Sequence, residues 1–132
     1  RFSRRATLKL LLDTHILLWW LGNTPSLSKK ASQLIADSTN IIFVSSASAW
    51  EFSIKKALGK LEGPEDFEDA LLANSFQPLP ITIPHALLAG QLPPHHDDPF
   101  DRLLVAQSKI EGLTLVTSDK KQMLYNVQTI AA

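Results

Sequence analysis

Acidic residues gather at one point of the sequence, the stretch HHDDPFDRLL at residues 95–104. Its aspartates lie where an apolar helix pattern begins. A helix N-terminus favours acids, because its free N–H groups and the positive end of its dipole stabilise negative charge. One acid is sufficient for that purpose, and Asp98 followed by Pro99 already forms a typical helix start. Asp101 is therefore a surplus acid that needs another explanation.

Three other acids occupy equivalent positions elsewhere in the chain. Asp13 and Asp119 each directly follow a predicted buried strand, and Glu51 lies one turn into the helix after another strand. In open α/β sheets, ligands bind in the crevice beyond the carboxyl ends of the strands. Together with Asp101, these acids are therefore expected to point into one crevice.

Each acid also has a purely structural explanation. Asp13 and Asp119 could cap the helices that follow them, and Asp101 could complete a capping box. Glu51 could pair with Lys55 at the i, i+4 spacing. Taken singly, these explanations are favoured for every acid except Asp101. The convergence of all four acids on one sheet edge favours a shared function instead.

A cluster of carboxylates is costly without a cation. Two carboxylates about 4 Å apart repel by about 4 kcal/mol at an effective dielectric near 20, and they raise one another's pKa. Oxygen ligands without cysteine suit Mg²⁺ or Mn²⁺. Mg²⁺ prefers one or two carboxylates together with waters and a phosphate oxygen, so the other acids would hold those waters. The chemistry that follows is metal-assisted hydrolysis of a phosphodiester bond.

The histidines near these acids offer a different metal site. His95 and His96 are adjacent, so on an extended loop they would point in opposite directions and form a poor zinc pair. His15 could reach the crevice from its place beside Asp13. We expect loop or supporting roles for these histidines, and metal ligation is the less favoured alternative. The sequence contains no G-x-S-x-G, Walker, G-x-G-x-x-G or D-x-D motif.

Composition limits the class of protein. A chain of 132 residues forms one domain with a real core. Lysine plus arginine and aspartate plus glutamate balance at 13 each, so an anionic substrate has to be held by local basic groups. The absence of cysteine excludes disulfides and thiolate sites and fits a reducing compartment, so we expect a cytoplasmic protein. No apolar run reaches membrane-spanning length, and no membrane partner is expected.

Strand and helix patterns alternate along the chain. Residues 1–7 are predicted to be a basic tail, disordered or left over from cloning, which leaves 8–132 as a single domain. Alternation predicts an α/β fold in which helices flank a mainly parallel central sheet, with the proline-limited strand at its edge. The predicted strands cover residues 7–12, 41–45, 77–83, 113–118 and 127–130. The predicted helices cover residues 14–22, 26–38, 46–60, 65–75, 84–92, 100–112 and 120–126.

The chain resembles the PIN-domain ribonucleases, and in particular the VapC-type toxins of toxin–antitoxin operons. The resemblance covers Leu8 to Ile130 and rests on LLLDTHILLWW, VSSASAWEFSIKKALGKL, HHDDPFDRLLVAQS and LVTSDKK, in the order of that family. It implies a PIN-like three-layer fold and a metal-dependent endoribonuclease that hydrolyses RNA phosphodiester bonds with a metal-activated water. It also implies Mg²⁺ or Mn²⁺ as cofactor, a cognate VapB-type antitoxin as inhibitor, and a homodimer.

Carried onto this chain, the resemblance selects the same four acids. The catalytic set is Asp13, Glu51, Asp101 and Asp119, with Asp13 and Asp101 as the direct metal ligands. The supporting set comprises hydroxyls that orient carboxylates or waters, a further acid that also caps its helix, and a cation that holds a carboxylate or a substrate phosphate. These residues are Thr14, Thr117 and Ser118, then Asp98, then Arg102.

Two further expectations concern binding surfaces. Contacts to substrate phosphates are expected from basic residues at the rim of the crevice: Lys55, Lys56, Lys60, Arg102, Lys120 and Lys121. The segment ILLWWL (16–21) is apolar all round, so part of it is expected to meet an antitoxin helix or a second copy of the chain. The alternative for this segment is a helix wedged between the sheet and the helix at 26–38.

The alternative to an enzyme is a non-catalytic RNA- or protein-binding PIN-like module that keeps the fold and uses the crevice only for contacts. The intact acidic set argues against it. Metal-dependent cleavage of RNA by the purified protein separates the two functions.

Overall fold

The computed structural model describes residues 7–132, so the predicted tail lies, apart from Thr7, outside the described residues. The strands are β1 (Lys9–Leu12), β2 (Ile41–Ser45), β3 (Gln77–Leu79), β4 (Thr114–Thr117) and β5 (Thr129–Ala131). The helices are α1 (Thr14–Leu21), α2 (Lys29–Ala36), α3 (Ser46–Ala57), α4 (Phe67–Ala73), α5 (Ile83–Gln91) and α6 (Pro99–Glu111), and a 3₁₀ turn, η1, covers Gln122–Leu124. In this part of the chain, none of the helices combines the length and apolar character that a membrane crossing requires.

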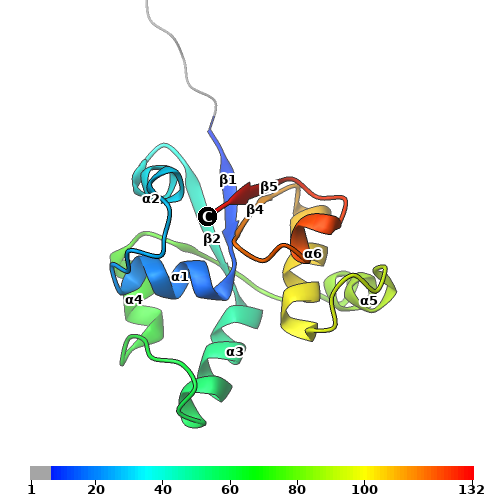
Figure 1. Cartoon of the computed structure of the whole chain (residues 1–132), viewed down its shortest axis with the longest axis horizontal. Helices are drawn as coiled ribbons and strands as arrows, with labels where there is room; N and C mark the ends of the chain where they lie inside the picture. The colour runs from blue at the N-terminus through cyan, green and yellow to red at the C-terminus, as the bar shows by residue number, and fades with distance from the viewer. Residues whose placement is uncertain (1–6) are drawn as a thin grey trace, which may run out of the picture.

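The strands form one sheet in the order β3-β2-β1-β4-β5, and every neighbouring pair is parallel (Figure 1). The predicted α/β architecture is therefore confirmed, with a sheet that is parallel throughout rather than mainly so. β1 lies at the centre, between β2 and β4. β3 lies at an edge, as the prolines of the predicted strand 77–83 indicate, because proline lacks the N–H group that a central strand donates to its neighbours.

Helices cover both faces of the sheet, which makes three layers (Figure 1). Successive residues of β1 point to opposite faces. Leu10 therefore joins a core cluster with residues of α1 and α2, whereas Leu11 joins a second cluster with residues of α5 and α6. A strand buried on both faces is uniformly apolar, which explains the run of leucines before Asp13.

The helix boundaries differ from the predicted ones where capping decides them. α2 begins at Lys29 rather than Ser26, because the Ser28 side chain accepts a hydrogen bond from the N–H of Ala31. The helix predicted at 120–126 is only the single turn η1.

α3 is oriented differently from what its apolar spacing indicates. The spacing of Ala47, Trp50, Ile54 and Leu58 predicts that they share one buried face. Of these four, only Ala47 is buried, whereas Trp50 is 59% and Leu58 64% exposed. The buried side of α3 carries Glu51 beside Ala47. This rotation of α3 turns the Glu51 carboxylate toward the carboxyl ends of the strands.

Candidate functional site

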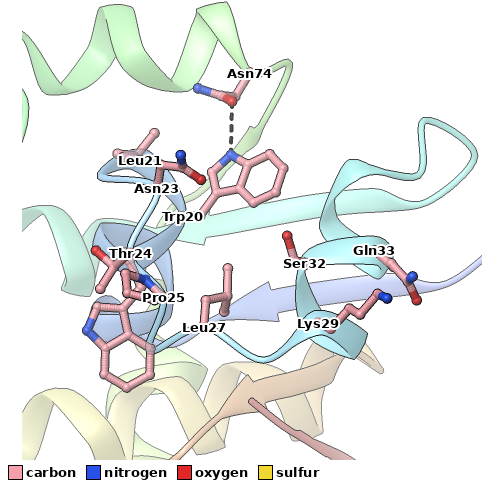
Figure 2. A pocket seen from close by; sticks show the side chains of 11 residues that line it. Trp20, Leu21, Asn23, Thr24, Pro25, Leu27, Lys29, Ser32, Gln33 and Asn74 are labelled. Carbon is pink, nitrogen blue, oxygen red and sulfur yellow. Dashed lines mark hydrogen bonds between the residues drawn. The ribbon is translucent and has the colours of Figure 1, made fainter.

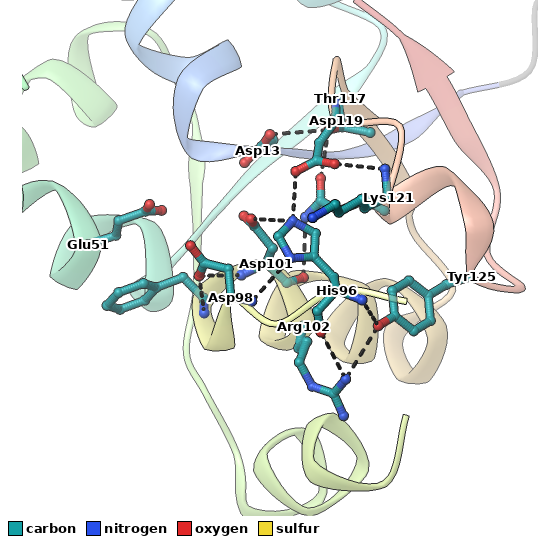
Figure 3. A network of polar contacts seen from close by, with 12 residues as sticks. Asp13, Glu51, His96, Asp98, Asp101, Arg102, Thr117, Asp119, Lys121 and Tyr125 are labelled. Atoms are coloured by element: carbon teal, nitrogen blue, oxygen red, sulfur yellow. Dashed lines mark hydrogen bonds and ion pairs between the residues drawn. The ribbon is translucent and has the colours of Figure 1, made fainter. Parts of the chain in front are cut away.

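Four acidic side chains meet at the carboxyl edge of the sheet (Figure 3). Asp13 follows β1, Glu51 comes from α3, Asp101 lies in the first turn of α6, and Asp119 follows β4. The negative charges of Asp13, Glu51 and Asp119 all raise the pKa of Asp101, as does Asp98. The structure thus brings the predicted acids together in one electrostatically coupled cluster.

Asp13 and Glu51 are the most deeply buried acids of this cluster. Asp13 is 4% and Glu51 2% exposed. Asp13 occupies the N-cap position of α1, but its side chain makes no capping hydrogen bond. Within the described residues, Asp13 Oδ1 and Glu51 Oε1 are buried without a hydrogen-bond partner. Such atoms are costly to bury, and burial accordingly raises the pKa of Asp13 to about 6.

Asp98 and Asp101 divide two tasks between them. The Asp98 side chain caps α6 by accepting hydrogen bonds from the N–H groups of Phe100 (2.8 Å) and Asp101 (3.4 Å). The Asp101 carboxylate faces the cluster, with Oδ2 2.9 Å from His96 Nε2. Burial, followed by the neighbouring acids, raises the pKa of Asp101 to about 8. Without a cation, Asp101 is therefore mostly protonated near neutral pH.

Asp119 is the most exposed of the four acids and the one that is best supplied with donors. Oδ1 accepts a hydrogen bond from the N–H of Lys121 (2.8 Å), and Oδ2 lies 2.7 Å from His96 Nε2. Burial alone would raise the pKa of Asp119, but the hydrogen bonds from His96 and Lys121 outweigh it and lower the pKa. Asp119 therefore stays charged more readily than Asp13 or Asp101 does.

His96 lies closer to the acids than its sequence position indicates. A nitrogen of His96 and one oxygen each of Asp101 and Asp119 lie within 4.8 Å of one another, a spacing that a metal ion could bridge. His95 instead packs edge-on against Tyr125, at 4.9 Å between ring centroids. Adjacency to the DDP segment was the only signal that His96 belongs to the site.

The hydroxyl of Thr117 connects two parts of the cluster. It lies 3.1 Å from Asp13 Oδ2 and 2.6 Å from Gln122 Oε1, and its single proton can serve one of these acceptors at a time. The same oxygen accepts a hydrogen bond from the N–H of Asp119 at 2.9 Å. Gln122 is fully buried and also donates to the carbonyl of Asp101. Sequence reasoning missed Gln122, because a glutamine in a polar segment gives no sign of burial.

The other two predicted hydroxyls do not touch the acids. Thr14 donates to the hydroxyl of Ser48 at 2.9 Å, so it joins α1 to α3 rather than orienting a carboxylate. Ser118 is exposed, and its hydroxyl has no hydrogen bond to another described residue. Their positions follow from strand and helix geometry, which turns Thr14 inward between helices and Ser118 toward solvent.

The sequence was compared with models of known protein families. The PIN domain model matches residues 10–128. The chain belongs to the PIN domain family. PIN domains are generally nucleases. No curated protein is similar enough to match this PIN domain.

Several solved structures share the PIN fold of this chain. One is a crystal structure of VapBC2 from Rickettsia felis bound to a DNA fragment from their promoter, with a TM-score of 0.68 and 19% identity over 94% of this chain and 98% of that chain. Another is DNA-bound VapBC from Salmonella typhimurium, with a TM-score of 0.64 and 17% identity over 95% and 98%. FitAcB from Neisseria gonorrhoeae has a TM-score of 0.60 and 17% identity over 92% and 96%. At these identities the likeness establishes the fold.

Arg102 stabilises the loop beside the acids of this PIN domain. The sequence predicts that it contacts a carboxylate or a phosphate. Instead, its guanidinium donates to carbonyl oxygens at the end of α5 and in the following loop, at distances of 2.9 to 3.2 Å, and to the Tyr125 hydroxyl at 3.4 Å. The carbonyls belong to Ala89, Leu92, Pro93 and His96. A planar fork with several donors suits this arrangement.

We expect Arg102→Leu to destabilise the protein by about 2 kcal/mol, because the carbonyls, most of which are partly buried, would lose a charged donor. The urea midpoint of unfolding, at an unchanged slope, measures this loss. Arg102→Lys should recover only part of it, since an ammonium cannot reach several carbonyls at once. A wild-type midpoint for Arg102→Leu would show that the loop does not depend on these contacts.

Proposed function

We propose that this PIN domain is a divalent-metal-dependent endoribonuclease and the toxin of a type II toxin–antitoxin pair. The observation that carries the catalytic proposal is the pair of buried, unpartnered oxygens on Asp13 and Glu51 inside the acidic cluster. A cation would supply the partner that these oxygens lack, and it would let neighbouring acids ionise together. An all-oxygen donor set suits Mg²⁺ or Mn²⁺. The fold shared with VapBC structures supports the toxin–antitoxin proposal.

The acids divide the work in this proposal. Asp13 and Asp101 hold the cation, and Glu51 Oε1 lies ready as a further acceptor for the cation or for a water beside it. When bound, such a cation lowers the pKa of a water molecule and neutralises phosphate charge. The hydrogen bonds to Asp119 favour its charged form. Its carboxylate orients a water molecule by accepting a hydrogen bond from that water. Thr117 fixes Asp13 relative to Asp119.

The test is cleavage of RNA by the purified chain. With Mg²⁺ or Mn²⁺ we expect internal cuts, which a chelator abolishes and added cation restores. If the protein binds these cations but cuts no RNA in a mixed cellular pool, it is the alternative, a non-catalytic RNA- or protein-binding module.

The expected phosphate contacts have to be revised for two lysines. Lys55 forms an ion pair with Glu51 at 2.5 Å, the pairing that its spacing suggests. That hydrogen bond, with the nearby acids, raises the pKa of Lys55. Lys56 donates to the carbonyl of Pro64 and lies over the ring of Phe52. Lys55 and Lys56 would have to leave these partners to contact RNA. The other expected lysines, Lys60, Lys120 and Lys121, are exposed.

We expect the double change Lys120→Gln and Lys121→Gln to weaken RNA binding and to reduce its salt dependence. Each lost phosphate contact on a single strand lowers the slope of log K against log salt by about 0.7. Binding titrations at several salt concentrations measure the slope. Lys29→Gln with Lys30→Gln, which removes two exposed charges from α2, is the matched control. An equal slope for the two double variants would place the RNA path elsewhere.

Part of the apolar segment ILLWWL lines a pocket in addition to packing against the core (Figure 2). Ile16 and Leu17 are fully buried. This side of α1 therefore matches the alternative in which the helix is wedged between the sheet and α2. Trp19 and Trp20 are half-buried and line a pocket of about 810 Å³ between α1 and α2, where Trp20 Nε1 donates to Asn74 Oδ1 at 3.0 Å. We propose that an apolar antitoxin helix binds in this pocket. The homodimer stays a prediction.

We expect Trp20→Glu to weaken binding of the cognate antitoxin about tenfold or more, because a charge would replace a half-buried aromatic side chain that the antitoxin would cover. Titration of labelled antitoxin gives the affinity, and mass in solution gives the assembly of the toxin alone. Ile83→Glu, a change at a side chain of α5 that is 75% exposed, is the control. A folded Trp20→Glu protein with unaltered assembly in both states would remove this pocket from the interface.

A further inference from the structure

His96 stands between two acids of the cluster (Figure 3). Its Nε2 lies 2.7 Å from Asp119 Oδ2 and 2.9 Å from Asp101 Oδ2. Two different roles fit these distances. An unprotonated Nε2 could bind a cation together with the two carboxylates, whereas a protonated Nε2 donates a hydrogen bond to them. Which role applies depends on where the ring carries its proton.

The other ring nitrogen decides the location of this proton. The backbone N–H of Asp98 donates to His96 Nδ1 at 3.1 Å. Nδ1 must therefore offer a lone pair, so the neutral ring carries its proton on Nε2. A protonated Nε2 has no lone pair left for a cation. If Nε2 were to bind a metal, the proton would have to move to Nδ1, where it would face the Asp98 N–H.

The loop holds the ring in this orientation from both sides of the His96 backbone. The N–H of His96 donates to the Tyr125 hydroxyl at 3.0 Å, and that hydroxyl donates to the Pro93 carbonyl at 2.7 Å. The carbonyl of His96 accepts a hydrogen bond from Arg102 at 3.1 Å. With the backbone and Nδ1 both fixed, the Nε2–H bond is aimed at the acids.

We infer that His96 is a positioning residue, which donates a hydrogen bond from Nε2 to Asp119 and is not itself a ligand of the cation. The inference rests on the proposed function, because the cation is part of that proposal. Asp119 then receives hydrogen bonds on both oxygens, from His96 on Oδ2 and from the Lys121 N–H on Oδ1. A carboxylate has about four lone-pair sites, so Asp119 can still accept from a water or hold a cation in the cluster. His96 thereby fixes the direction in which Asp119 presents its charge.

The first test reads the proton directly, in the full chain and without RNA. Long-range ¹H–¹⁵N NMR of histidine-labelled protein distinguishes protonated from unprotonated ring nitrogens, and His96→Gln identifies the His96 signals. We expect a protonated Nε2 and an unprotonated Nδ1 near neutral pH, unchanged by saturating Mg²⁺. In the Mn²⁺ form, pulsed electron paramagnetic resonance should show no directly bound imidazole nitrogen. A protonated Nδ1, or a bound imidazole nitrogen that disappears in His96→Gln, would overturn the inference.

The second test separates a donor from a ligand by substitution. The amide NH₂ of glutamine can take the place of imidazole Nε2–H, whereas alanine offers nothing. We expect His96→Ala to weaken Mg²⁺ binding about tenfold in calorimetric titrations, as for other residues that orient metal ligands. His96→Gln should restore most of this affinity, and His95→Gln should match the wild type. If glutamine is as poor as alanine in a protein that remains folded, His96 does not act as a donor.

The two proposals fail in different ways. A protein with the expected ring proton and Mg²⁺ affinity that cuts no RNA contradicts the ribonuclease and leaves the role of His96 intact. Metal-dependent cleavage together with a His96 nitrogen bound to Mn²⁺ contradicts only the role of His96. A protein that binds neither Mg²⁺ nor Mn²⁺ contradicts both.

Discussion

Replacing Asp101 by asparagine should reduce Mg²⁺-dependent RNA cleavage on the order of a thousandfold, while the protein stays folded. A neutral amide binds a hard cation poorly, and a cation contributes several kcal/mol to stabilising the charge that develops in phosphodiester hydrolysis. Asp13→Asn should have a similar effect. Single-turnover cleavage of an end-labelled RNA measures the rate, and circular dichroism verifies the fold.

Asp97→Asn is the matched control for this experiment. Asp97 belongs to the same acidic segment but is exposed. The substitution removes the same charge from the same loop, and we expect the wild-type rate. If Asp101→Asn also cleaves RNA at the wild-type rate with Mg²⁺ present, the assignment of the site is wrong.

The metal-free protein should lose stability as the pH rises from about 4 to about 8. In the folded state, burial raises the pKa of Asp13 to about 6, and burial together with the other acids raises that of Asp101 to about 8, from an ordinary value of 3.8. The folded state therefore binds more protons than the unfolded state in this interval. Protonated Asp13 and Asp101 make their full contribution to the unfolding free energy below pH 3.8, the ordinary pKa. This contribution is lost as the pH rises through their folded-state pKa values of about 6 and about 8. At about 1.4 kcal/mol per pKa unit, the loss amounts to several kcal/mol.

The Asp101→Asn variant isolates this contribution. Asp119 has a lowered pKa, so its opposite contribution is lost only as the pH falls below its ordinary value of 3.8 and does not overlap the interval. Urea unfolding with a chelator, at about pH 5 and about pH 8, should show the variant gaining stability over the wild type at the higher pH. Mg²⁺ should stabilise the wild type most at that pH, because its ligands must be deprotonated. A pH-independent difference between the two proteins would contradict the raised pKa of Asp101.

The fold was open to prediction because its signals are local. The apolar runs before Asp13 and Asp119 match strands buried on both faces, and helical spacing between them indicates crossovers of a parallel sheet. The acids could be found for the same reason. In such a sheet, a residue that directly follows a strand must lie at the carboxyl edge, whatever the details of packing.

The rest of the site depends on contacts that leave no pattern in the sequence. Arg102 binds main-chain carbonyls, and carbonyls are the same at every position. Gln122 and His96 meet the acids only because the loops after α5 and β4 lie side by side. The exposed stripe that begins at Trp50 shows a further limit. Apolar spacing predicts the buried face of a helix, but in α3 the buried face carries Glu51 while Trp50 and Leu58 are exposed.

The hydrogen bond between Thr117 and Asp13 joins residues that lie 104 positions apart in the chain. β1, which ends just before Asp13, is synthesised before β4, and it completes its pairing only when β4 has left the ribosome. During translation at about 5–20 residues per second, the growing chain can pair β1 with β2 alone, and Asp119 does not yet exist. The acidic cluster can therefore assemble only after β4 and Asp119 have been synthesised. If the proposed ribonuclease activity needs the complete cluster, a growing chain that has not yet reached Asp119 should be unable to cut RNA.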